Sequence, residues 1–173
     1  MVEFVPLDPI VHSNDFVQMN IEYITSLQDL LDKTYQLDTR SILETSIEQR
    51  AKETLKEFSS IKPPNGVVYV LKVDGIAAGM GAIRKIGEGV GEIKRMFNYP
   101  KYRGMGFGRM MLNKLLESGR EFGFSVFMLD TPRFAFAAQG LYRSVGFKET
   151  GVYPESAIQP PWDQYWLYME KKE

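Results

Sequence analysis

Three glycines at alternate positions mark the stretch whose residue types point most clearly to chemistry. Gly104, Gly106 and Gly108 follow an apolar run at 93–97 and precede an amphipathic run at 109–122, an order that indicates strand, tight loop and helix. Glycine permits positive φ and has no Cβ to hold a ligand away from the backbone. Inward-turned N–H groups and the partial positive charge of the helix N-terminus would then hold an anion such as a phosphate. An ordinary tight turn is the alternative interpretation.

Two familiar phosphate loops do not fit this stretch. The Walker loop requires lysine and then serine or threonine after its last glycine, whereas Arg109 and Met110 follow Gly108. The dinucleotide pattern G-x-G-x-x-G fails as well, because these glycines run G-x-G-x-G. The pattern that remains is Arg103-x-x-Gly106-x-Gly108.

The elements before this loop are expected to form a helical front and an antiparallel meander. A short strand at 2–5 precedes two helices, the first capped by Asn14 or Asp15 and the second ending by Pro63-Pro64. Three strands then follow, joined by turns at Asp74-Gly75 and at 87–89. They are predicted at 67–73, 76–84 and 90–97.

The elements after the loop are expected to add a parallel strand and a second site-bearing helix. A strand at 125–129 that follows a helix should lie parallel to the strand before that helix. Thr131-Pro132 is predicted to start the next helix, because proline is favourable in a first turn. Gly146 ends this helix, and strands at 147–152 and 165–170 complete the chain.

Composition excludes several classes of function. The 173 residues are 44% hydrophobic and 25% charged, as expected of a single globular domain over 1–173. A net charge of −1 gives no reason to expect nucleic acid or a membrane surface as partner. Without cysteine there is no disulfide or thiolate nucleophile, and no metal is expected. The single histidine, His12, is expected at the surface, which argues against a Ser-His-Asp hydrolase.

A cytoplasmic location is expected, because no targeting signal is seen in the sequence. The first residues lack the basic stretch and the apolar core of a signal peptide. No run approaches the roughly 18 apolar residues that a membrane-spanning helix needs.

The motif Arg103-x-x-Gly106-x-Gly108 resembles the R/Q-x-x-G-x-G/A signature of the GNAT acetyltransferases, and the segment 141–147 is similar to their L-Y-x-x-x-G-F segment. The element order β-α-α-β-β-β-α-β-α-β-β matches that family too. The resemblance implies an α/β (α+β) fold with a mixed, mostly antiparallel central sheet of about seven strands and helices on both faces.

The resemblance also implies a site for acetyl-coenzyme A. The glycine loop would hold the pyrophosphate, and the strand edge before it would pair with the pantetheine arm like an added strand. The cofactor-binding residues implied are Met96, Phe97, Asn98, Arg103, Gly104, Met105, Gly106, Phe107, Gly108 and Tyr142. One departure is Ala135, which stands where the family often has an asparagine.

Tyr142 and Glu92 are the catalytic candidates. By resemblance, the Tyr142 hydroxyl lies near the thioester sulfur and protonates, or hydrogen-bonds to, the departing thiolate. A phenol with a pKa near 10 keeps its proton at neutral pH. Glu92 lies where some members carry the general base that deprotonates the amine. The alternatives are a core tyrosine and an exposed strand glutamate paired with Lys94.

The acceptor site is less defined by the sequence. Aromatic residues in the regions expected to flank it form either an apolar wall for an amine or simply core and subunit contacts: Tyr35, Phe134, Phe136, Tyr153, Trp162, Tyr165 and Trp166. The proline-rich segment 153–163 is a candidate lid or homodimer element.

The function implied is direct transfer of an acetyl group from acetyl-coenzyme A to a primary amine, without a metal or a covalent enzyme intermediate. The acceptor stays open between a small-molecule amine and a peptide amine. A peptide would favour an open groove, and a polyamine or antibiotic an acidic pocket. A module that binds acyl-coenzyme A with little catalysis is the remaining alternative.

Overall fold

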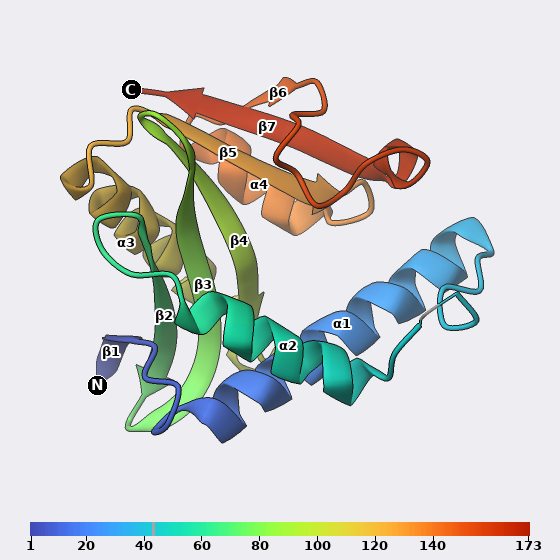
Figure 1. Cartoon of the computed structure of the whole chain (residues 1–173), viewed down its shortest axis with the longest axis horizontal. Helices are drawn as coiled ribbons and strands as arrows, with labels where there is room; N and C mark the ends of the chain where they lie inside the picture. The colour runs from blue at the N-terminus through green and yellow to red at the C-terminus, as the bar shows by residue number, and fades with distance from the viewer. Residues whose placement is uncertain (43) are drawn as a thin grey trace.

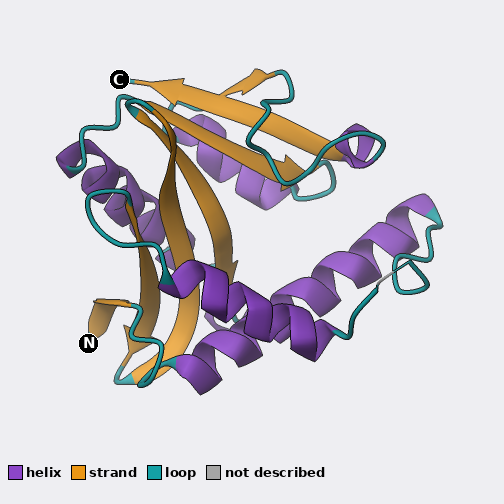
Figure 2. Cartoon of the chain, in the orientation of Figure 1, coloured by secondary structure: helices purple, strands orange, loops and turns teal. Residues whose placement is uncertain are grey.

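A seven-stranded sheet in the order β1-β2-β3-β4-β5-β7-β6 forms the centre of the molecule. The computed structural model describes residues 1–42 and 44–173, with helices on both faces of the sheet (Figures 1 and 2). The strands are β1 (Val2–Pro6), β2 (Gly66–Val73), β3 (Ile76–Gly87), β4 (Val90–Asn98), β5 (Val126–Pro132), β6 (Lys148–Thr150) and β7 (Trp166–Lys172). The helices are α1 (Ser13–Tyr35), α2 (Ile47–Ser59), α3 (Phe107–Glu121) and α4 (Phe136–Ser144). The expected fold class and element order are confirmed.

The meander β2-β3-β4 follows from its turn chemistry and its β-branched strands. Asp74 and Gly75 join β2 to β3 with φ of 50° and 80°, both left-handed, as a two-residue hairpin turn requires. In β4, by contrast, the register against β3 shifts: Met80 lies opposite Phe97 and Ala82 opposite Lys94. This bulge has no counterpart in the predictions from sequence.

The sheet separates at its middle. The parallel pair β4 and β5 is joined at Val90, Glu92 and the residue between them, opposite Val126–Met128. Beyond Glu92, β4 continues along β3 as far as Asn98, while β5 stays paired with β7 (Figure 1). The backbone edge of β4 that faces β5 therefore lacks a partner strand from residue 93 onward, as a site for an added strand requires.

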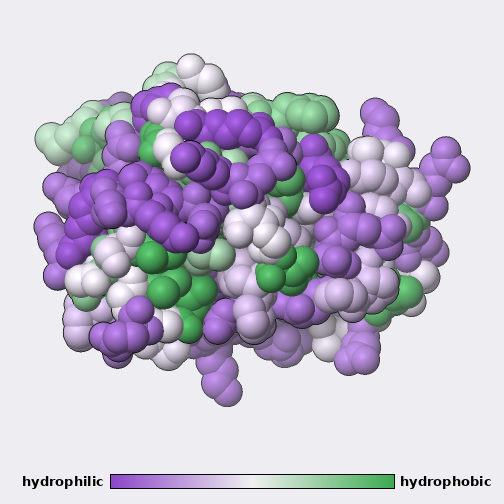
Figure 3. Space-filling view, turned by 90° about the horizontal axis from the view of Figure 1, so that it is seen from above, coloured by the Kyte–Doolittle hydropathy of each residue, from purple (hydrophilic) through white to green (hydrophobic). Residues whose placement is uncertain are grey.

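Apolar packing on both faces holds the two parts of the sheet. On one face, α3 buries Met111, Leu112 and Leu115 against the sheet, in a cluster that also includes Tyr142 of α4. On the other face, α1 and α2 cover β2 to β4 with residues such as Phe16 and Phe58. Each fully buried side chain of this size contributes about 1.5–3 kcal/mol to stability. The face that carries β7 mixes polar residues with separate apolar patches (Figure 3).

The start of the helix α4 was predicted in the wrong position. Thr131 and Pro132 belong to β5, where they pair with Leu167 and Trp166 of β7, so that α4 begins later, at Phe136. The strand ladder with β7 takes precedence over the local preference of proline for a first helical turn.

His12 is not at the surface as expected. Its side chain is 4% exposed, because the chain turns there into α1. The neutral Nδ1 accepts a hydrogen bond from the Asp8 backbone N–H at 3.0 Å. Burial lowers the pKa of His12 below its ordinary value.

Hydropathy adds one observation on membranes. None of the helices formed by residues 1–42 and 44–173 combines the length and the apolar character needed to cross a bilayer.

Candidate functional site

A cleft of about 870 Å³ opens where β4 and β5 separate. Its walls come from α1, the unpaired part of β4, the end of β5, the start of α4 and the glycine loop. A cleft of this volume is in the range of small-molecule and cofactor sites.

The glycine loop has the backbone that an anion site requires. Gly104 and Gly106 have φ of 74° and 83°, and an added Cβ at either would meet nothing within 4 Å. Gly106 occupies the N-cap position of α3, whose first-turn N–H groups have no partner within the helix. Open space, N–H donors without a partner in the helix, and the helix dipole therefore coincide at one end of the cleft.

Side-chain contacts connect this loop to the end of β4. The Arg103 Nε donates to the Asn98 carbonyl at 3.2 Å. With its amide oriented so that donors face acceptors, the Asn98 side-chain oxygen accepts from the Gly108 N–H at 3.2 Å. The two parts of the expected cofactor site are thus adjacent.

The cleft brings together most of the residues expected to bind the cofactor: Met96, Phe97, Asn98, Arg103, Gly104, Gly106, Gly108 and Tyr142. Two loop residues do not line it. Met105 is 59% exposed, and Phe107 packs into the core with 8% of its surface accessible.

Tyr142 lies on α4 with its ring packed edge-on against Phe147. It lines the cleft, although it is only 6% exposed. Burial, more than the nearby Tyr23 and Asp130, raises the pKa of Tyr142 well above that of a free phenol. With this raised pKa, the hydroxyl keeps its proton at neutral pH. No hydrogen bond from the described residues engages it, so it is free to donate to a ligand.

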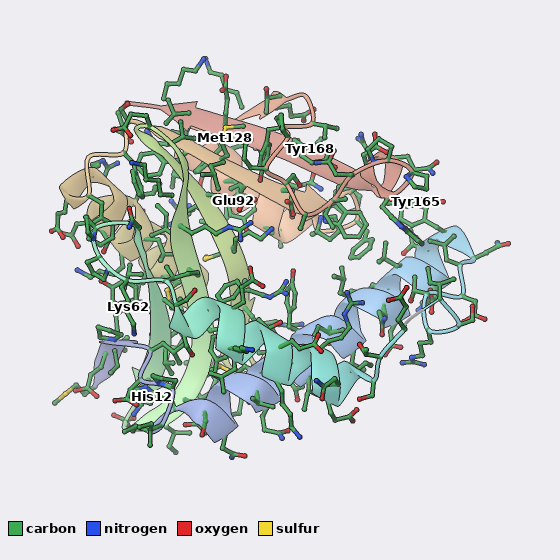
Figure 4. All side chains as sticks on the ribbon, in the orientation of Figure 1. His12, Lys62, Glu92, Met128, Tyr165 and Tyr168 are labelled. Atoms are coloured by element: carbon green, nitrogen blue, oxygen red, sulfur yellow. The ribbon has the colours of Figure 1, made fainter. Side chains whose placement is uncertain are left out.

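Glu92 lies at the last residue pair of β4 and β5, next to Met128, and is fully buried (Figure 4). Its carboxylate accepts from the Arg84 Nε at 2.7 Å, the Tyr153 hydroxyl at 2.8 Å and the Lys94 Nζ at 3.4 Å. The pairing with Lys94 that the sequence left open is therefore present. Glu92 does not line the cleft, whereas Lys94 does.

Asp130 is a cleft carboxylate that the sequence reasoning missed. It accepts from the Ser156 hydroxyl at 2.8 Å and lies 3.6 Å from the Lys94 Nζ. The neighbouring Tyr153 has a raised pKa, first through burial and then through Glu92 and Asp130. The available signal was an acidic residue directly after a buried strand, at the carboxyl edge of a parallel pair where ligands bind in open α/β sheets.

The expected aromatic wall is divided between the cleft and contacts among the aromatic residues themselves. Phe134, Phe136 and Trp166 line the cleft, together with Ala135. The other aromatic residues pack against one another: Tyr35 with Tyr165 and Tyr165 with Trp162, at ring distances of 4.5 and 6.2 Å, and Tyr153 with Tyr168 at 5.9 Å. Across residues 1–42 and 44–173, no group of three or more acidic or histidine side chains is arranged to hold a metal ion.

Solved structures with the same fold include acetyltransferases. An N-acetyltransferase, PaiA, from Thermoplasma acidophilum in complex with coenzyme A has a TM-score of 0.72 at 16% identity, covering 100% of this chain and 99% of that chain. An acyl-CoA N-acyltransferase from Klebsiella pneumoniae has a TM-score of 0.70 at 22% identity, covering 99% of this chain and 97% of that one. At these identities the likeness shows the fold.

Sequence relatives extend the comparison. An uncharacterized N-acetyltransferase of Schizosaccharomyces pombe is 33% identical over 56% of this chain and 60% of its own length. An IAA acetyltransferase of Azospirillum brasilense is 34% identical over 68% of this chain and 74% of its own length. The model of the acetyltransferase (GNAT) family matches residues 25–147, which include β4, the glycine loop and Tyr142. The chain therefore belongs to the GNAT family of acetyltransferases and is an acyltransferase, as its glycine loop and element order indicated.

Proposed function

We propose that this protein transfers an acetyl group from acetyl-coenzyme A directly to a primary amine, within a single domain over residues 1–173. The observation that carries the proposal is one cleft in which a glycine loop, an unpaired strand edge and a buried tyrosine meet. Acetyl-coenzyme A would supply the acetyl group as a thioester, so that a carbon–nitrogen bond forms while the carbon–sulfur bond breaks.

The glycine loop and β4 are proposed to hold the two ends of the cofactor. Backbone N–H groups within residues 103–108 that have no protein partner bind the pyrophosphate, supported by the Arg103 side chain in the same wall. The backbone of Met96, Phe97 and Asn98 pairs with the amides of the pantetheine arm, because this edge has no strand beside it. A backbone N–H in this gap polarises the thioester carbonyl.

Tyr142 is proposed to stabilise the leaving thiolate by a hydrogen bond. A thiol has a pKa near 8.5, and the pKa of Tyr142 is raised above that of an ordinary phenol. Complete proton transfer from the phenol to the sulfur is therefore unfavourable. The hydroxyl stabilises the developing charge while keeping its proton.

Glu92 stays our candidate for the general base. Its ion-pair partner on the cleft wall is Lys94, 3.4 Å from the carboxylate, so the amine proton would reach Glu92 along this polar cluster rather than directly. Asp130, which lines the cleft itself, belongs to the same cluster.

The test is acetyl transfer by the purified chain to a panel of amines and amine-bearing peptides. The expected result is release of free thiol together with an acetylated amine identified by mass spectrometry. Coenzyme A binding in calorimetry without turnover of any amine would instead favour the binding module. No binding at all would contradict the assignment of the cleft.

A further inference from the structure

Arg95 lies at the bulge of β4 in a conformation that arginine rarely adopts. Its φ is 54°, in the left-handed region, between residues 94 and 96, where the register against β3 shifts. Strain of this kind at a residue without a glycine's freedom persists where the surroundings fix it, and it concentrates at binding sites. The bulge places Arg95 in the wall of the cleft.

Aromatic rings hold the guanidinium without satisfying its donors. Its Cζ lies 5.2 Å from the ring centre of Tyr23, which also lines the cleft, and 5.6 Å from that of Phe58. The Nε is buried and has no hydrogen-bond partner. Ring faces attract a cation but accept no ordinary hydrogen bond, so the guanidinium is positioned while its donors stay unpaired within the described residues.

The charges of the cleft single out the same side chain. Four cations line it, Lys94, Arg95, Arg103 and Arg109, against one carboxylate, Asp130. Lys94 pairs with Glu92 and Asp130, Arg109 donates to Ser144, and Arg103 donates to the Asn98 carbonyl. Within the described part of the chain, Arg95 alone among the four has neither an ion pair nor a side-chain hydrogen bond.

We propose that the Arg95 guanidinium binds a carboxylate on the acceptor, so that the acceptor is an amino acid or another small amine that carries a carboxylate. The proposal rests on the proposed function, because it assigns the substrate class of the same cleft. A guanidinium presents two parallel N–H donors to a carboxylate, which fixes both the position and the orientation of the bound molecule. Apolar residues nearby in the wall, Leu27 and Leu30 of α1, accommodate the remainder.

The test compares amino acids with their carboxamides as acceptors for the wild type and for Arg95→Gln. Glutamine keeps the unbranched Cβ and the backbone strain, but loses the charge. We expect kcat/KM for the acids to fall about 10- to 100-fold, the range for losing charge-assisted hydrogen bonds, while the carboxamides change a few-fold at most. Comparing the acid-to-amide ratio between enzymes cancels the different amine pKa values of the two substrates.

Two further variants separate charge from packing. Arg95→Lys keeps the positive charge but lacks the planar pair of N–H donors. Its acid-to-amide ratio of kcat/KM is expected to lie between those of the wild type and Arg95→Gln. Arg120→Gln removes a guanidinium from α3 that pairs with Glu173 outside the cleft, and its ratio should equal that of the wild type. Coenzyme A affinity, measured by calorimetry, should be unchanged in all three.

An equal acid-to-amide ratio in wild type and Arg95→Gln would overturn the proposal. If no amine is acetylated, the proposed function fails, but calorimetry of coenzyme A-loaded protein with the same acids and carboxamides still decides the role of Arg95. If Arg95→Gln does not fold, the same titration of the wild type decides whether the cleft prefers a carboxylate. If the carboxamides bind as tightly as the amino acids, the proposal is contradicted. If the amino acids bind more tightly than their carboxamides, it is supported.

Discussion

The hydroxyl of Tyr142 can be removed without disturbing its ring. Because no described residue hydrogen-bonds to it, Tyr142→Phe should cost less than the roughly 1 kcal/mol of an average lost hydrogen bond. If the hydroxyl stabilises the leaving thiolate, kcat should fall by about one to three orders of magnitude, since the interaction strengthens as the bond breaks. Coenzyme A affinity should stay within a few-fold of wild type. Steady-state kinetics and calorimetry measure both.

Tyr69→Phe provides the matched control. The Tyr69 hydroxyl shares a hydrogen bond with Ser118 at 3.0 Å in the core, away from the cleft. This variant should lose about 1 kcal/mol of stability and keep its turnover. Full activity in Tyr142→Phe, or equal losses in both variants, would make Tyr142 a packing residue.

Glu92 and Arg84 allow the base to be separated from the ion pair. Glu92→Gln and Arg84→Gln each break the 2.7 Å contact, and each should lower the unfolding free energy, by up to about 3–5 kcal/mol. If Glu92 is the base, Glu92→Gln alone should lower turnover about 100-fold and remove the acidic limb of the pH–rate profile. An acidic limb that survives in Glu92→Gln assigns the proton to another group.

The candidate site residues that could be proposed from the sequence are those whose signal is local. The glycine loop and Tyr142 lie in short motifs that resemble those of the family, so the sequence alone was enough to propose them. Asp130 and Arg95 enter the cleft because β4 separates from β5 and because β4 bulges against β3. The bulge leaves no pattern within a few residues, so Arg95 was not identified, whereas the position of Asp130 after a buried strand was a signal that the sequence reasoning did not use.

Gly106 joins the loop to α3, and the cost of replacing it lies in the backbone. Its φ of 83° is unfavourable for valine, while the space around the new side chain is open. Gly106→Val should therefore shift the loop and raise the dissociation constant of coenzyme A about tenfold, or 1.4 kcal/mol. Calorimetry measures the change.

Gly75→Val is the control for backbone strain alone. Gly75 has a φ of 80° and equally open space in the hairpin between β2 and β3. The Gly75→Val variant should be less stable than the wild type but bind coenzyme A with the same affinity. Equal affinities in the two variants would locate the phosphates elsewhere.

Turns were predicted from the sequence more accurately than the first and last residues of helices and strands. The Asp74-Gly75 hairpin has its cause in two adjacent residues, and it was placed correctly. The start of α4 was misplaced, because whether Thr131 and Pro132 extend a strand depends on β7, which comes much later in the sequence. The same reason limits the prediction of the last two strands.

His12 links the fold of the whole molecule to pH. Burial depresses its folded-state pKa below the ordinary value near 6.5, so the unfolded chain takes up the proton first. Its contribution to stability is then present above about pH 6.5 and lost as the pH falls through the folded-state value. The unfolding free energy of wild type should drop between about pH 7 and 5 relative to His12→Gln, which cannot ionise. Chemical denaturation at several pH values measures the difference, and parallel curves would contradict it.

The order of strands and helices could be predicted from the sequence, but the burial of particular polar residues could not. The alternation of strands and helices and the family resemblance lead to the seven-stranded sheet. The placement of His12 and Glu92 inside it depends on which elements cover which face, and a polar residue beside a turn gives no local sign of being enclosed.

The gap between β4 and β5 also determines what can enter the cleft once hydration is considered. In the free protein, the N–H and C=O groups on the open edge of β4 satisfy their hydrogen bonds with water. A ligand with amides along its length replaces that water bond for bond, so displacement costs little and the released water favours binding. A plain alkyl chain of the same length would dehydrate these groups without replacing their bonds, at about 1–3 kcal/mol for each group. The unpaired edge of β4 therefore favours ligands that carry amides over purely apolar ligands of the same length.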